Sequence, residues 1–432
     1  MERTEIPDAT SAAGPRHFLS GTCVVQRSHD RLSAYALFSG LLAAAGLPIY
    51  IHAPKFYVDE YGVSLAALGA TLFGLRLLDV VQDPILGWIS ERLRNRRSLL
   101  VVIGAAIISL SMFGLFVALP PLPPLLWFAL MLTGVFSAFS LLSINFYAQG
   151  VEKADRLETG SHLRLARWRE TGALIGICLA AISPALLAPI MNNPFAGFAA
   201  GFAVVTFLAV LAMRKEWGTV SAIASSGFGV ILKDYEARSL LIIALLNAAP
   251  VAVTSTLFLF FVESRLQATG WEGPLLVLFF LSAAVASPIW SLCAEKWGTV
   301  RVLILAMIIG LGAFAFAIPL REGDTLIFAI ICVVSGAALG ADLTLLPAMF
   351  AKRMAKIAPS GTEGFGLWSF VSKFALAFAA VTLLPILEIF GFRVGSENSQ
   401  DALFVLSLLY AGLPCVLKVL AIMVILIARP GE

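Results

Sequence analysis

The stretch GLRLLDVVQDPILGWISERLRNRR, from Gly74 to Arg97, shows best how this chain is built. It starts as an apolar run but carries Arg76, Asp79 and Asp83 at spacings of three and four, and it ends in basic residues. Residues three and four apart share one face of a helix. The pattern predicts a membrane span with one ionic face, followed by a basic loop.

The composition of the whole chain is that of a polytopic membrane protein. Hydrophobic residues make up 59% of the 432 residues and charged residues 13%, whereas soluble domains have about 45–50% and about 25%. So few charges cannot cover the surface of a soluble protein of this length. The first thirty residues contain no apolar run of signal-peptide length, and we therefore expect the first span itself to direct insertion.

Twelve apolar stretches are long enough for membrane helices, which need about 20 residues. Lipid offers no hydrogen bonds to the backbone, so runs this continuous are helices. The sequence predicts an all-α polytopic membrane protein. Its spans are expected near 32–55, 65–90, 98–119, 124–149, 168–190, 195–213, 239–262, 273–295, 299–319, 325–350, 364–390 and 401–428.

Basic residues are distributed unequally between the two sets of loops. Counted with the adjoining ends of the spans, loops 2/3, 4/5, 6/7, 8/9 and 10/11 together hold 18 Lys and Arg residues, and the opposite set holds only Lys55, Arg265, Arg321 and Arg393. The positive-inside rule therefore predicts that both termini are cytoplasmic, which agrees with an even number of spans. We expect a multi-pass protein of the bacterial inner membrane.

The longest internal loop divides the predicted spans into two sets of six. A weak repeat supports the division, because DPILGWISERLRNRR from Asp83 matches SPIWSLCAEKWGTVR from Ser287, with Pro84 opposite Pro288. Matches at equivalent places favour duplication, and two parallel six-helix repeats around a central site are typical of the major facilitator fold. The predicted parts are an N-terminal cytoplasmic tail, a six-helix half, a central cytoplasmic loop and a second six-helix half, at 1–31, 32–213, 214–238 and 239–432.

Ionisable side chains at membrane depth are the main functional signal. Each costs about 2.5–3.5 kcal/mol at the centre of a span, so such a residue is expected to face a cavity or a partner. Asp79 and Asp83 repel each other unless a cation or a proton lies between them. Gln82 adds a neutral oxygen, and Pro84 frees a backbone carbonyl one turn earlier. Oxygen ligands of this kind suit a hard cation such as Na⁺.

Lys373, deep in the predicted eleventh span, is the natural counter-charge for these acids when no ion is bound. We interpret Asp79, Asp83 and Lys373 as a coupling site for Na⁺ or H⁺. The alternative is a structural salt bridge from Arg76 to Asp79, with Asp83 at the cytoplasmic rim. Lys373 would then extend its ammonium group towards the membrane surface.

Further polar residues are candidates for a charge network or a substrate cavity. Asp342 and Lys418 could pair within the second half or contact substrate. Glu170 lies beside several arginines, and we expect this group to latch one conformation from the cytoplasmic side, although Arg167 or Arg169 could also reach an anionic or hydroxylated substrate. Hydrogen bonds between helices and interfacial anchoring are the alternatives for the remaining cavity candidates, which are Ser140, Asn145, Asn247 and Trp368.

Sequence motifs favour neither an enzyme nor a nucleic-acid-binding protein. The five cysteines and four histidines are scattered, and the sequence pairs no nucleophile with a base. GTEGFG from Gly361 follows no strand, so it is not a nucleotide fingerprint. We expect no cofactor apart from the coupling ion, no nucleic acid and no obligate protein partner. The expected partners of this monomer are a small-molecule substrate and membrane lipid.

With these residues in view, the chain resembles the glycoside–pentoside–hexuronide:cation symporter family, which is melibiose permease-like. The resemblance runs from the first span to the twelfth and is most specific in FYVDEYGVSLAALGATLFGLRLLDVVQDPILGWISERLRNR, GADLTLLP and EGFGLWSFVSK. It implies a major facilitator fold, cation ligands at Asp79 and Asp83, and a coupling role for Lys373. LLAAAG from Leu41 and FSAFSLLSIN from Phe136 lack the acids that galactoside-transporting members have in spans one and four.

These observations predict a cation-coupled secondary transporter that moves a small polar solute, such as a glycoside or related metabolite, by alternating access. The alternative is an H⁺-linked exporter or a lysolipid-type transporter of the same fold. Abundant phenylalanine and few polar residues in the predicted cavity motivate that alternative.

Overall fold

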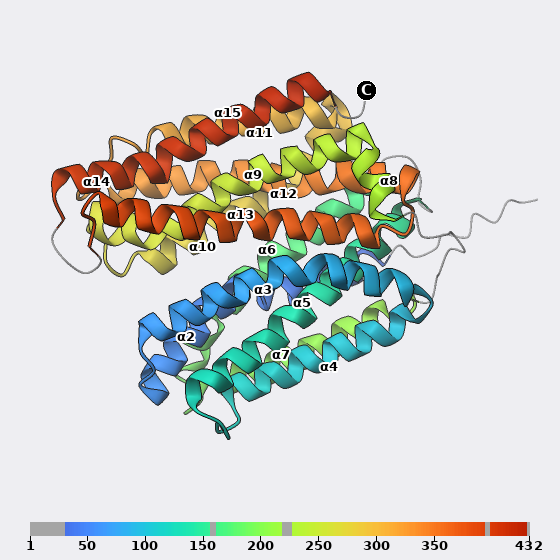
Figure 1. Ribbon diagram of the computed structural model, residues 1–432, viewed down its shortest axis with the longest axis horizontal. Helices are drawn as coiled ribbons and strands as arrows, with labels where there is room; N and C mark the ends of the chain where they lie inside the picture. The colour runs from blue at the N-terminus through green and yellow to red at the C-terminus, as the bar shows by residue number, and fades with distance from the viewer. Residues whose placement is uncertain (1–30, 156–160, 218–226, 394–397, 430–432) are drawn as a thin grey trace, which may run out of the picture. The chain divides into compact units, whose positions relative to one another are not determined.

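The computed structural model describes residues 31–155, 161–217, 227–393 and 398–429. The compact unit Leu32–Glu432 contains every described helix. Nearly all of the predicted N-terminal tail, and 218–226 of the central loop, lie outside the described residues. The elements, many of them labelled in Figure 1, are α1 (Leu32–Ala44), α2 (Leu47–Tyr61), α3 (Leu65–Arg92), η1 (Arg94–Arg96), α4 (Arg97–Phe116), α5 (Pro124–Asp155), α6 (Ser161–Leu187), α7 (Pro194–Met213), α8 (Phe228–Lys233), α9 (Tyr235–Phe260), η2 (Phe261–Arg265), α10 (Glu272–Trp297), α11 (Thr299–Ala315), α12 (Thr325–Ile357), α13 (Thr362–Ile389), α14 (Gln400–Ser407), η3 (Leu408–Gly412) and α15 (Leu413–Ala428).

The helices account for the twelve predicted spans. Eight helical segments of the described chain are long and apolar enough to cross a membrane, and they correspond to α4, α5, α7, α9, α10, α12, α13 and the continuous segment from α14 to α15. Two shorter apolar helices, α1 and α11, add to them. The remaining two long helices, α3 and α6, each carry several charged residues. The protein is therefore an all-α, multi-pass membrane protein, as predicted.

The helices differ from the predicted spans mainly at their ends. The first span is broken at Ala45 and Gly46 into α1 and α2, and Pro48 in the first turn of α2 lacks the N–H that would continue α1. α6 begins at Ser161 rather than at 168, and α12 ends at Ile357 rather than at 350. Apolar composition marks the length of a helix that lies inside the membrane. The backbone hydrogen bonds of the helix continue beyond that length, through polar residues.

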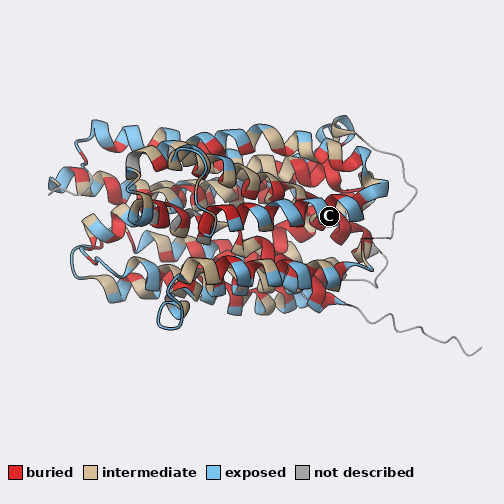
Figure 2. Cartoon of the chain, turned by 90° about the horizontal axis from the view of Figure 1, so that it is seen from below, coloured by how far each residue is buried: buried red, intermediate tan, exposed pale blue. Residues whose placement is uncertain are grey.

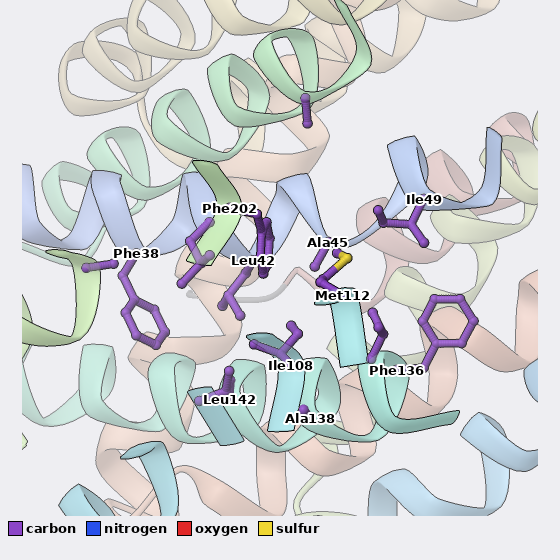
Figure 3. Packing of buried hydrophobic residues seen from close by; sticks show 14 of the residues in the cluster. Phe38, Leu42, Ala45, Ile49, Ile108, Met112, Phe136, Ala138, Leu142 and Phe202 are labelled. Carbon is purple, nitrogen blue, oxygen red and sulfur yellow. The ribbon is translucent and has the colours of Figure 1, made fainter. Parts of the chain in front are cut away.

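Apolar packing is concentrated inside each half of the chain. One large buried cluster draws on residues between 32 and 217 and includes Phe38, Met112 and Phe202, which Figure 3 shows in close packing. A second large cluster draws on residues between 252 and 411. Many outward-facing apolar side chains remain exposed, Leu110 and Phe378 among them, and exposed segments cover the outside of the bundle in Figure 2. Such outward faces are expected of helices whose solvent is lipid.

Two helix pairs make the most extensive contacts between the halves. α13 packs along α3, and α10 packs along α6. Leu174 of α6 is buried against Ala283 and Ala284 of α10. The prolines that the sequence repeat aligns, Pro84 and Pro288, lie inside α3 and α10 respectively. The charged helix α3 is therefore placed directly against a helix of the other half.

Candidate functional site

Lys373 lies between the two carboxylates of α3. Its ammonium nitrogen is 3.1 Å from Asp83, with which it forms a hydrogen bond and an ion pair, and 3.6 Å from an oxygen of Asp79. It also donates to the hydroxyl of Ser140 on α5 at 2.5 Å. The two carboxylates are 5% and 0% exposed, so neither can rely on water to stabilise its charge. Three helices from two halves thus build one ionic cluster.

Neutral side chains complete the cluster. The amide nitrogen of Gln82 donates to Asp79 at 2.5 Å, and its carbonyl oxygen accepts a hydrogen bond from the Ser137 hydroxyl at 2.9 Å. Ser369 of α13 donates to Asp83. Carboxylate and hydroxyl oxygens thus surround the lysine nitrogen, and the Gln82 amide and the Ser369 hydroxyl bond to the same carboxylates. Oxygen donors of this kind can hold a hard monovalent cation or, at the carboxylates, a proton.

Local sequence explains why these groups meet. Asp79 and Asp83 are four residues apart and project from one face of α3. Pro84, inside the helix, lacks an N–H and so frees the carbonyl of Val80. Arg76 lies one turn before Asp79 and is half-buried, while the ion pairs described for the two aspartates are with Lys373.

Two members of the cluster were missed from sequence, Ser137 and Ser369. Serine is common in membrane helices, where it bonds to the backbone or to neighbouring helices. The signal that could have found Ser369 is its position four residues before Lys373, on the same helical face. Ser137 is likewise one turn before Ser140 on α5. In both cases only the hydrogen-bond partner on another helix shows that the serine belongs to the cluster.

Asp342 and Lys418 form a separate buried pair. The Lys418 ammonium donates both to Asp342 of α12 and to the side-chain oxygen of Asn247 on α9. All three residues are at most 9% exposed. Asp342 and Lys418 border a small cavity of about 50 Å³ that is otherwise mostly apolar. These contacts lie within the second half. The sequence predicted either this pairing or a contact with substrate.

The arginines near Glu170 make two different kinds of contact. The Nε of Arg169 donates to its neighbour Glu170 at 2.8 Å, and its guanidinium stacks over the ring of Tyr147 at 4.0 Å. Arg167 is 4.0 Å from Glu295 of α10, in the other half. The second contact joins the halves as the predicted latch requires, although side chains this exposed contribute little energy.

The last two candidates make contacts of other kinds. The amide nitrogen of Asn145 donates to Ser90 of α3 at 2.9 Å, which is an interhelical hydrogen bond. Trp368 packs its ring 5.0 Å from that of Phe350. Among the residues that the structure describes, no group of three or more His, Cys, Asp or Glu side chains is arranged to hold a metal ion.

The fold and the buried ionic cluster define a class of protein, and comparison with known proteins identifies it. A solved structure entitled "Crystal structure of a bacterial homologue of iron transporter ferroportin in outward-facing state" is similar, with a TM-score of 0.64 and 15% identity over 90% of this chain and 99% of that one. At this identity the likeness shows the fold alone. The protein is a multi-pass membrane protein with a major facilitator fold.

The family follows from the sequence match. The family model described as MFS/sugar transport protein matches residues 34–429. The chain therefore belongs to that family, the melibiose permease-like transporters of the major facilitator superfamily, and the resemblance seen in the sequence is confirmed. Membership of this family makes the protein a membrane transporter, not an enzyme. No curated protein matches the chain.

Proposed function

We propose that the protein is a cation-coupled symporter that imports a small polar solute, a glycoside or related metabolite, across the bacterial inner membrane. Na⁺ or H⁺ is the coupling ion, and both termini lie in the cytoplasm. The observation that carries the proposal is the position of Lys373, whose ammonium group lies against Asp79, Asp83 and Ser140. The ammonium group of Lys373 thus occupies the place where a coupling ion would contact the same oxygens.

The proposed mechanism follows from charge balance. Two buried carboxylates and one ammonium leave a net negative charge, which is costly at membrane depth. A cation that binds to the aspartates competes with Lys373 for them and changes the contact between α3 and α13. Because these helices belong to different halves, ion binding shifts the balance between conformations in which the halves are closed and open. Solute transport is then driven by the ion gradient.

Thermal unfolding of the purified protein in Na⁺, Li⁺, K⁺ and choline across a range of pH tests the proposal without a known substrate. An ion at 100 times its dissociation constant stabilises by about 2.7 kcal/mol. We expect a Na⁺- or pH-dependent rise in Tm that is lost in Asp79→Asn and Asp83→Asn. Asp401→Asn, which changes an exposed carboxylate at the start of α14, is the matched control and is expected to keep the response.

Each outcome of this experiment has a meaning. A Na⁺-selective shift supports Na⁺ symport and calls for a glycoside screen with Na⁺ present. A shift with pH alone supports H⁺ coupling and brings forward the alternative, an H⁺-linked exporter or lysolipid-type transporter. If no ion or pH effect depends on Asp79 and Asp83, the coupling assignment is wrong.

A further inference from the structure

The turn between α11 and α12 carries an apolar groove in the second half of the protein. Its lining comes from the end of α11, the loop that follows and the first turns of α12, and it has a volume of about 560 Å³. Ligand sites typically have about 300–1,000 Å³. Among the described residues that line the groove, only Asp324 is charged. We call it the α11–α12 groove.

The groove has the properties of a surface that faces lipid. Phe316, Ile327 and Ile330 line it and are exposed although they are large and apolar. Phe328, one residue after Ile327, is buried instead and packs its ring 5.4 Å from that of Phe261 in the core of the second half. The groove therefore lies on the opposite face of α12 from that core, where hydrocarbon chains are the expected solvent.

The shortness of α11 places the loop near the edge of the hydrocarbon layer. With 17 residues, α11 is about 26 Å long at 1.5 Å per residue, whereas the hydrocarbon core of a bilayer is about 30 Å thick. The loop from Phe316 to Asp324 is therefore expected at the level where acyl chains join their headgroups. A polar group beside the groove can meet a headgroup at this level.

Two arginines lie together at this end of the groove. Arg321 follows Leu320, which lines the groove, and the Nε of Arg265 donates to the Leu320 carbonyl oxygen at 2.8 Å. The two guanidinium groups are close enough to repel each other. Arg265 is half-buried and Arg321 is exposed. Two positive charges are thus held beside an apolar groove.

The protein itself supplies no counter-charge for these arginines. None of the ion pairs found among the described residues involves Arg265 or Arg321. Asp324 accepts a hydrogen bond from the backbone N–H of Arg321 rather than from its guanidinium. The two arginines are also half of the four basic residues in the loops predicted to be outside, where the positive-inside rule does not favour basic residues. An external anion would explain their presence.

The chemistry of the ligand follows from the two parts of the site. Guanidinium groups bind phosphate oxygens through charge-assisted, often bidentate hydrogen bonds, and the groove suits a hydrocarbon chain. A phospholipid has both groups, whereas free phosphate has no chain and a neutral lipid has no anion.

We propose that the α11–α12 groove binds a phospholipid of the outer leaflet, with one acyl chain in the groove and the phosphate on Arg265 and Arg321. This lipid is bound at the surface of the second half and is not the transported solute, so the inference does not depend on the coupling ion. The leaflet follows from the predicted orientation, whereas binding itself does not.

Native mass spectrometry of the detergent-purified full chain tests the site. The probes are dioleoylphosphatidylglycerol and dioleoylglycerol, which has the same chains but no phosphate. We expect the first phosphatidylglycerol to bind more tightly than dioleoylglycerol. Arg321→Gln is expected to raise the Kd for phosphatidylglycerol about tenfold, because a hydrogen bond between charged groups is lost, and to leave the Kd for dioleoylglycerol unchanged.

Two matched controls accompany the variants. Arg393→Gln makes the same charge change at an exposed position of another loop and is expected to keep the native Kd. Ile330→Trp fills the groove and is expected to weaken the binding of both lipids. Leu326→Trp changes an exposed residue of the same helix that does not line the groove, and it is expected to have no effect. If Ile330→Trp does not fold, the two arginine variants still decide the test.

The opposite results would overturn the proposal. Equal Kd values for the two lipids, or for Arg321→Gln and Arg393→Gln, would mean that no phosphate is recognised. Equal binding by Ile330→Trp and Leu326→Trp would mean that the groove holds no chain. Inorganic phosphate is expected not to bind at the lipid concentrations used, and binding as tight as that of phosphatidylglycerol would make this a site for a free anion.

Discussion

At the scale of single residues, Lys373 compensates a charge that the membrane would otherwise make costly. Its ammonium contacts two buried carboxylates and a serine from three helices. Removing one partner of a buried ion pair costs about 3–5 kcal/mol, because the remaining charge is left unpaired. The lysine therefore contributes to stability, and under the proposed function it also competes with the coupling ion for the two carboxylates.

Replacing this lysine separates those two effects. We expect Lys373→Met to lower the Tm in choline. We also expect Na⁺ to raise the Tm of this variant more than that of the native chain, because no ammonium group then neutralises the two carboxylates. Thermal unfolding in choline and Na⁺ measures both. Lys296→Met, at an exposed position of α10, serves as the control. An unchanged Tm in choline would mean that Lys373 does not neutralise the acids.

At the scale of secondary structure elements, Asp234 ties α9 to the end of α12. It accepts a backbone hydrogen bond from Ala237 as the N-cap of α9, and it forms a bidentate contact with Arg353. Hydrogen bonds from Arg353 hold the pKa of Asp234 below its ordinary value, and the backbone bond from Ala237 adds to the effect. The region joins the central loop to the second half.

The lowered pKa sets the sign of a pH dependence. A carboxylate whose pKa is lower in the folded state stabilises the protein at pH values above its unfolded pKa of about 3.9, and that stabilisation is lost as the pH falls through the folded pKa. Asp234→Asn keeps a capping side chain but loses the charge. We expect native and variant Tm values to differ at pH 6, and we expect the difference to shrink as the pH falls below about 4 and to vanish below the folded pKa. A constant difference across this range would contradict the account.

At the scale of the whole molecule, each half has its own large apolar cluster, and the most extensive contacts between the halves are those of α3 with α13 and of α6 with α10. Such an arrangement suits a rocking motion of one half against the other. Loop charges predict that the basic loop after α3 and both termini are cytoplasmic.

Single cysteines in opposite loops test this orientation. In a chain without native cysteines, we expect Glu322→Cys to react with a membrane-impermeant maleimide added to spheroplasts, and Lys296→Cys to react only in inverted vesicles. Both positions are exposed, so access to the reagent is decided by the membrane. The reverse labelling pattern would place the termini outside and would contradict the predicted topology.

The sequence by itself determined the class of the protein and part of its site. Apolar runs locate membrane helices because lipid cannot satisfy the backbone, and the resemblance to a transporter family was carried by the residues around Asp79 and Asp83. Helix spacing places those two acids on one face, a local property that any helix would share. The charge of Lys373 at membrane depth likewise required a partner, and the two acids were the evident choice.

Only the tertiary structure decided which groups meet across helices. Lys418 pairs with Asp342 and Asn247 inside one half, whereas Lys373 reaches across to the other, although both are single lysines in apolar spans. The close approach of α3 to α13 at Gly87 and Gly366 is equally absent from any local pattern. Sequence spacing describes one helix at a time, and the crossing of two helices depends on how all their faces pack.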